Sequence, residues 1–115
     1  MTQIKGQYNL FGLLYTKRSP SQYSFPRYLG QKVICRGEEH TITGIDKYYT
    51  FFEDNTGGSP TDTRPANKQE YIESLKVELE YEHYLLDHCK LGDSFRNIYI
   101  KNIEILEKAL KEATA

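Results

Sequence analysis

The sequence predicts an α+β fold, in which a small antiparallel β-meander of three to four strands (about residues 3–53) precedes a C-terminal α-helical hairpin (about 67–91 and 94–112). Two observations predict it. β-branched and aromatic residues cluster in the first half of the chain, whereas after residue 66 apolar residues recur at steps of three and four. Since 115 residues suit one domain, we divide the chain into a β unit (1–53), a flexible loop (54–66) and the helical hairpin (67–112).

Four segments supply the predicted strands. In residues 3–16 apolar and polar residues alternate, and the parity changes at Gly12, where a bend or bulge is natural. Residues 17–26 are rich in Ser and Pro and predict a loop. Three short strands follow at 32–36, 40–46 and 47–53, separated by turns at 36–39 and 46–47. An open sheet of this size buries too little area alone, so it needs a cover.

The predicted hairpin has recognisable helix boundaries. Asn67, followed three residues later by Glu70, is typical of a helix start. Gly92 fits a helix stop, and Asp93 or Ser94 is suited to cap the second helix. The first helix would be about 36 Å long, more than short strands cover. We therefore expect a homo-oligomer that forms through the helical hairpin.

Glu82 interrupts the apolar seam of the first predicted helix. A carboxylate at such a position is either exposed at a frayed edge or buried opposite a cation. A buried polar residue in a seam also fixes register and oligomeric state.

Composition excludes several classes of protein. The chain shows no apolar run long enough for a transmembrane helix and no pattern of a signal peptide. Two cysteines do not make a disulfide scaffold, so we expect a reducing, cytoplasmic compartment and no membrane partner. No nucleophile is paired with a base, which indicates a protein that is not an enzyme and uses no cofactor.

Charge is distributed unevenly although the net charge is −1. Residues 1–36 carry six basic side chains and no acidic ones, interleaved with aromatic rings. Cations that hold phosphates and rings that stack on bases suit a nucleotide or a single-stranded nucleic acid. The alternative is that this basic segment docks on the acidic helices of its own chain.

Arginines and nearby rings are the candidate ligand-binding residues. The Gly-rich stretch 55–61, followed by Arg64, is suited to wrap a phosphate, although it lacks the Gly-Lys-Ser/Thr ending of a P-loop and also fits a plain connector. Phe95-Arg96-Asn97 opens the second helix, where anions are favoured. The predicted ligand-binding set is Arg18, Tyr23, Phe25, Arg27, Arg36, Arg64, Arg96 and Asn97.

Other chemistry has weaker support, and we predict no catalytic or metal-binding residue. His83 and Asp87 share a helix face, but a metal site there needs a third ligand from elsewhere, for instance His40. Glu53 and Asp54 adjoin at the end of a predicted strand, where neighbours point to opposite faces, so they do not form a catalytic pair.

A short β unit followed by a helical hairpin is similar in outline to small phage accessory proteins. These include anti-CRISPR proteins and sponges that sequester nucleotide immune signals. The resemblance implies a non-enzymatic oligomer that captures a phosphate-bearing nucleotide-type ligand in an anti-defence role. The alternatives are a protein–protein interaction or inhibitor module, as in anti-CRISPR proteins, and a nucleic-acid-binding accessory protein.

Overall fold

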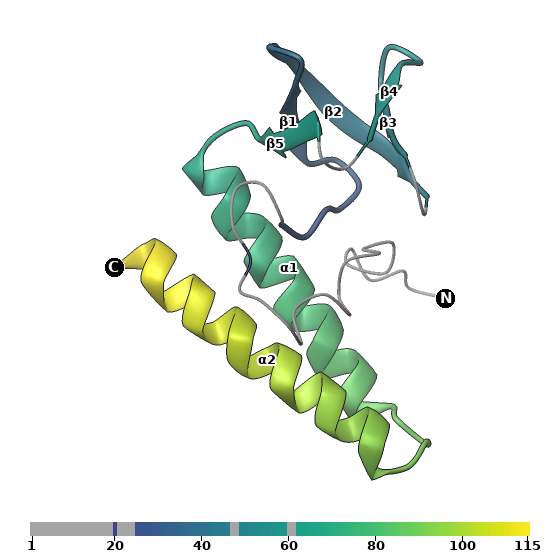
Figure 1. The fold of residues 1–115 in the computed structure, drawn as a ribbon, viewed down its shortest axis with the longest axis vertical. Coiled ribbons are helices and arrows are strands. Elements are labelled where there is room, and N and C mark those ends of the chain that lie inside the picture. Colours follow the sequence, from purple (N-terminus) through teal and green to yellow (C-terminus); the bar gives the residue numbers. More distant parts are fainter. Residues whose placement is uncertain (1–19, 21–24, 47–48, 60–61) are drawn as a thin grey trace.

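Five strands precede two helices in the computed structural model, which describes residues 20, 25–46, 49–59 and 62–115 (Figure 1). The predicted α+β fold, an antiparallel sheet followed by a helical hairpin, is confirmed. The elements are β1 (Lys32–Cys35), β2 (Glu38–Ile45), β3 (Thr50–Phe52), β4 (Gly57–Gly58), β5 (Thr63–Pro65), α1 (Lys68–Asp87) and α2 (Asp93–Thr114). The strand predicted over 3–16 lies outside the described residues, as do residues 47–48 at the start of another predicted strand.

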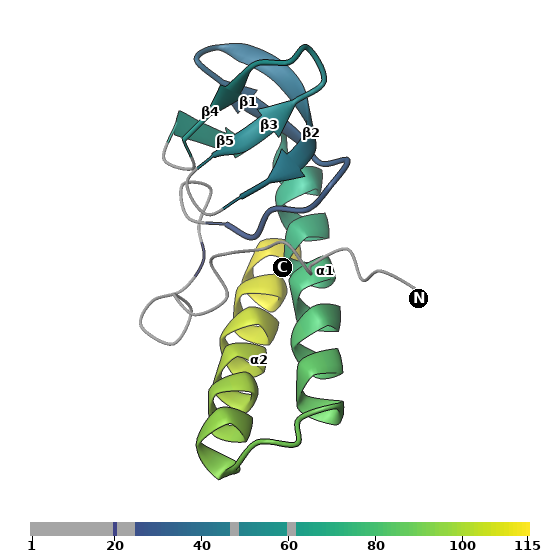
Figure 2. The same cartoon turned by 90° about the vertical axis from the view of Figure 1, so that its right-hand side faces the viewer.

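All strand pairs are antiparallel, in the order β4-β3-β2-β1-β5. A tight turn at Arg36-Gly37 joins β1 to β2, and both residues have positive φ (51° and 81°). Two-residue hairpin turns take this conformation because it matches the twist of the strands. The long strand β2 pairs with β1 on one side and β3 on the other, and its register shifts between Ile42 and Gly44. This irregularity bends the sheet around its core (Figure 2).

The stretch 54–66, which the sequence predicts to be a loop, contributes the two edge strands of the sheet. β4 pairs with β3, and β5 pairs with β1. Strands of two and three residues carry little propensity of their own, and pairing with a neighbour holds them in place. Gly58 is needed at its position, because a Cβ there would lie 2.8 Å from the buried Cys35 Sγ.

Buried apolar side chains fill the inner side of the sheet: Phe25, Val33, Cys35, Ile42 and Phe52. A second cluster of Leu75, Leu106 and Ala109 joins the two helices. Tyr71 packs against both clusters, so the first turn of α1 ties the sheet to the hairpin.

The start of α1 is built as the sequence predicts, because the Asn67 side chain accepts a hydrogen bond from the Glu70 backbone N–H at 2.9 Å. The Glu70 carboxylate does not close a capping box. Its Oε2 accepts instead from the Tyr28 hydroxyl at 3.2 Å and from the Lys32 backbone N–H at 3.1 Å. Burial and this carboxylate raise the pKa of the Tyr28 hydroxyl. The helix start is therefore fastened to β1.

The far end of the hairpin differs from the prediction. α1 ends at Asp87 rather than near residue 91. His88 is its C-cap, and the His88 ring stacks on Tyr84, 4.1 Å between centroids. Gly92 serves as the N-cap of α2 instead of the stop of α1. The hairpin projects away from the sheet, with the α1–α2 connection at the end most distant from it (Figures 1 and 2). No helix in the described part of the chain has the length and apolar character needed to cross a membrane.

Candidate functional site

Two of the eight predicted ligand-binding residues lie in the protein interior. Phe25 is fully buried and Arg27 is 2% exposed. The Arg27 guanidinium stacks over the Phe25 ring at 4.3 Å and donates from Nη2 to the Thr63 hydroxyl at 2.6 Å. It also donates to the Phe25 carbonyl at 3.3 Å. Arg27 thus connects the segment before β1 to strand β5, and Phe25 belongs to the core of the sheet.

The remaining predicted residues separate into two groups, while Arg18 and Tyr23 lie outside the described residues. Arg36 and Arg64 are exposed on the sheet. Arg96 and Asn97 are exposed in the first turns of α2, at the distant end of the hairpin, where Arg96 Nη1 donates to the Leu86 carbonyl at 3.4 Å (Figure 1). The expectation that Arg96 and Asn97 complete a site alongside the N-terminal segment thus rests on residues outside the described part. Among the described residues, Arg64 pairs with Ile34 of β1, two residues before Arg36, so these two arginines belong to the same strand pair.

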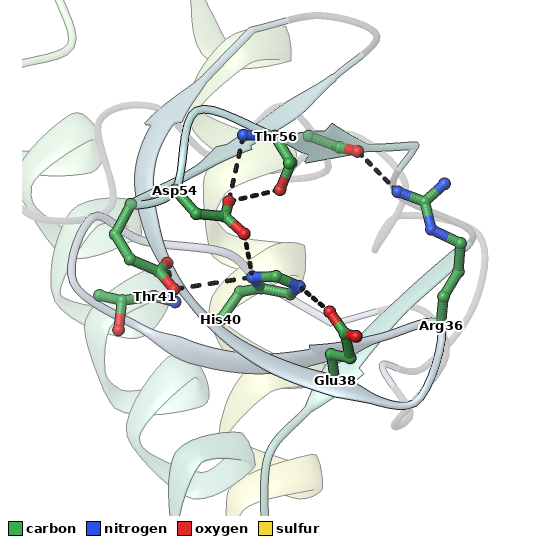
Figure 3. A network of polar contacts seen from close by, with 8 residues as sticks. Arg36, Glu38, His40, Thr41, Asp54 and Thr56 are labelled. Atoms are coloured by element: carbon green, nitrogen blue, oxygen red, sulfur yellow. Dashed lines mark hydrogen bonds and ion pairs between the residues drawn. The ribbon is translucent and has the colours of Figure 1, made fainter.

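Arg36 is held against strand β4. Its Nη2 donates to the Gly57 carbonyl at 3.1 Å, from a turn with left-handed backbone (Figure 3). Gly57 pairs with Phe51 of β3, and a Cβ on Gly57 would lie 3.7 Å from the Phe51 ring. The Phe51 side chain is 44% exposed. The Arg36 guanidinium and the exposed Phe51 ring are therefore both neighbours of Gly57.

A second group of polar side chains surrounds His40 on β2 (Figure 3). The imidazole is buried, stacked on Phe52 with 4.4 Å between ring centroids and 10° between planes. Its Nδ1 lies 3.6 Å from Glu53 Oε1 and 3.6 Å from Asp54 Oδ2. Its Nε2 lies 3.8 Å from Glu38 Oε2. Three carboxylates thus converge on one buried ring.

Hydrogen bonds hold two of these carboxylates in place. Glu53 Oε2 accepts from the Thr41 backbone N–H at 2.6 Å, which is the main reason its pKa is lowered. Asp54 Oδ1 accepts from the hydroxyl and the backbone N–H of Thr56, and the hydroxyl bond contributes most to lowering its pKa. In each carboxylate one oxygen is held and the other faces His40.

The convergence of Glu53 and Asp54 corrects the expectation that they point to opposite faces. That rule applies inside a strand, but β3 ends at Phe52 and both residues belong to the following turn. Asn55, with φ of 65°, reverses the chain there. The signal in the sequence that indicates this turn is Asp54 two residues before Thr56, a spacing typical of an Asx-turn.

His83 and Asp87 share a face of α1, and among the described residues no third ligand-type side chain lies with them. Both residues are exposed on α1. Within the described residues, His40, Glu53 and Asp54 form the one group of three ligand-type side chains that lie together.

Glu82 is buried, as one of the two alternatives predicted, but the partners that it contacts, Glu78 and Asn102, are not cations. It lies against Glu78 of the preceding turn and Asn102 of α2. Burial raises the pKa of Glu82, and hydrogen bonds with Glu78 and Asn102 offset part of that effect. Two adjacent buried carboxyl groups favour sharing a proton.

Comparisons with family models, with curated proteins and with solved structures find no match to this chain.

Proposed function

We propose that this chain is a non-enzymatic binding protein that captures a phosphate-bearing ligand of the nucleotide type on its sheet. The observation that carries the proposal is the contact of both Arg36 and Phe51 with Gly57. A nucleotide needs a cation for its phosphate and an apolar face for its base, and these two side chains supply both beside the same residue, Gly57.

The backbone fixes Arg36 in advance of binding. Arg36 lies in a turn with φ of 51°, and its guanidinium is hydrogen-bonded to Gly57. It therefore loses less conformational entropy on binding than an unconstrained surface arginine would. Arg64 adds a second exposed guanidinium on the same strand pair, since it pairs with Ile34 of β1, two residues before Arg36.

A short anion suits this surface better than a long nucleic acid. The carboxylates of Glu38, Glu53 and Asp54 lie around His40, and along the chain they are only two to four residues from Arg36 and Gly57, so they would repel an extended row of phosphates. The acidic neighbours therefore favour a single nucleotide held by Arg36.

A second function, self-association or docking of a protein partner, is favoured by a different observation. Exposed apolar side chains gather near the distant end of the hairpin: Tyr84, Leu91, Phe95 and Ile100. Their exposed fractions range from 39% to 59%. We keep the homo-oligomer, the anti-defence role and the cytoplasmic location as predictions. Free thiols at Cys35 and Cys89 support a reducing compartment.

Calorimetric titration with a panel of mononucleotides, cyclic nucleotides and inorganic phosphate tests the proposal. We expect saturable binding in the wild type and loss of at least about tenfold in affinity in Arg36→Gly. Glycine favours the left-handed turn, so this variant keeps the fold while it removes the guanidinium. Arg96→Gln, at the other end of the molecule, is the matched control and should bind as the wild type does.

Two results would overturn the proposal. One is that no member of the panel binds. The other is that Arg36→Gly binds as tightly as the wild type. Chromatography of the ligand recovered after heating tests whether the protein is an enzyme, because a protein that only binds its ligand returns it chemically unchanged.

A further inference from the structure

We propose that His40, Glu53 and Asp54 form a binding site for a divalent transition-metal ion of the size of zinc. The site would use Nδ1 of the imidazole and one oxygen from each carboxylate. It is separate from the ligand contacts of Arg36 and Phe51, and it holds whether or not a nucleotide binds.

The distances suit a shared ion better than direct contacts. At 3.6 Å, both Nδ1–oxygen separations exceed a hydrogen bond of about 2.7–3.2 Å. Ligands about 2.1 Å from a tetrahedral zinc ion lie about 3.4 Å apart. The two Nδ1–oxygen separations are close to that value, and all three ligand atoms lie within 4.8 Å of one another.

The imidazole nitrogen is the independent sign of a ligand. The His40 side chain is 9% exposed, and its Nδ1 is buried without a hydrogen-bond partner. A buried polar atom without a partner is costly, so an ion at this position would satisfy it. That nitrogen faces the two carboxylate oxygens that are not held by Thr41 and Thr56.

The surroundings of the three ligands resemble an outer ligand shell. A histidine that binds a metal through one nitrogen usually donates its other ring N–H to a carboxylate. His40 turns Nε2 toward Glu38 Oε2, 3.8 Å away, so a carboxylate lies on the side of the ring opposite the proposed ion. The stacking of the ring on Phe52 fixes its plane. Little reorganisation is therefore needed for an ion to bind.

The donor set identifies the kind of ion. Imidazole favours zinc and its neighbours over calcium and magnesium, and two carboxylates balance a charge of +2. Three protein ligands leave a fourth position open to water or to an anion. The alternative is that the three side chains form a polar cluster without a metal ion.

Metal binding by the full chain separates these two cases. After treatment with a chelator, the wild type is titrated with Zn²⁺ in competition with a chromophoric indicator. Cobalt(II) is then used as a spectroscopic probe of coordination. We expect one ion per chain at this site and a cobalt spectrum of low coordination number. Asp54→Asn and Glu53→Gln should each weaken zinc binding by about tenfold or more.

Two matched controls accompany these variants. Glu39→Gln removes an exposed carboxylate next to His40 in the sequence, and His83→Gln removes an exposed histidine of α1. Both should bind zinc as the wild type does. Circular dichroism checks that each variant is folded, which the surface position of Glu53 and Asp54 favours.

Three outcomes would overturn the proposal. These are a wild type that binds neither zinc nor cobalt, Asp54 and Glu53 variants that bind as the wild type does, and binding that is lost only in the His83 variant. Failure of the nucleotide titration leaves the metal result standing, because the two experiments use different variants and different probes.

Discussion

Replacing Arg27 by alanine should destabilise the fold rather than remove a ligand contact. The buried guanidinium makes hydrogen bonds with the Thr63 hydroxyl and the Phe25 carbonyl, and stacks on the Phe25 ring. Hydrogen bonds from a charged donor contribute about 1.5–3 kcal/mol each, and a desolvated cation–π contact about 2 kcal/mol. These contributions are not additive, so we expect Arg27→Ala to lower the free energy of unfolding by about 3–5 kcal/mol.

Urea denaturation followed by far-ultraviolet circular dichroism measures this loss. Arg64→Ala, which truncates an exposed arginine on the neighbouring strand β5, is the control and should change stability by no more than about 0.5 kcal/mol. A loss below about 1 kcal/mol for Arg27→Ala, together with unchanged m-values, would refute the structural role assigned to this residue.

Three further predictions concern single positions. Gly58→Ala should cost about 1–3 kcal/mol in urea denaturation, because the new methyl group would lie 2.8 Å from Cys35 Sγ; a neutral result would contradict the tight packing of β4. Asn67→Ala should cost about 0.5–2 kcal/mol through loss of the helix cap, and Asn67→Ser should recover most of it in the same assay. The raised pKa of Glu82 means that the folded state keeps its proton to higher pH than the unfolded state. The resulting stability is complete below the ordinary pKa of 4.5 and is lost as pH rises through the raised value. Glu82→Gln should therefore become more stabilising, relative to the wild type, as thermal unfolding is repeated from pH 4 to pH 8, whereas Glu80→Gln should show no such trend.

The sequence best predicts those structural features that are determined by residues close together in the chain. Asn67 and Glu70 carry the start of α1 in their own side chains and backbone, and the structure confirms that start. The apolar periodicity continues to Cys89, so it does not show that α1 ends at Asp87. Strands β4 and β5 depend on partners elsewhere in the chain, so their Gly, Thr and Pro residues read as a loop.

The candidate sites were harder to predict for the same reason. Arg27 belongs to a charge pattern typical of a surface, and only the fold shows that Thr63 and Phe25 enclose it. The approach of Glu53 and Asp54 to His40 depends on the pairing of β2 with β3 and on the turn that follows. Spacing along the chain does not contain that information.

The attachment of the helices through Glu70 and Tyr71 has a mechanical consequence. The hairpin is fastened to the sheet at the first turn of α1. The 20 residues of α1 therefore act as a rigid spacer about 30 Å long between the sheet and the α1–α2 connection. A partner held at the tip and a ligand held on the sheet would not compete for space. Two copies joined by their tips would present two sheets facing away from each other, which allows one assembly to bind two ligands independently.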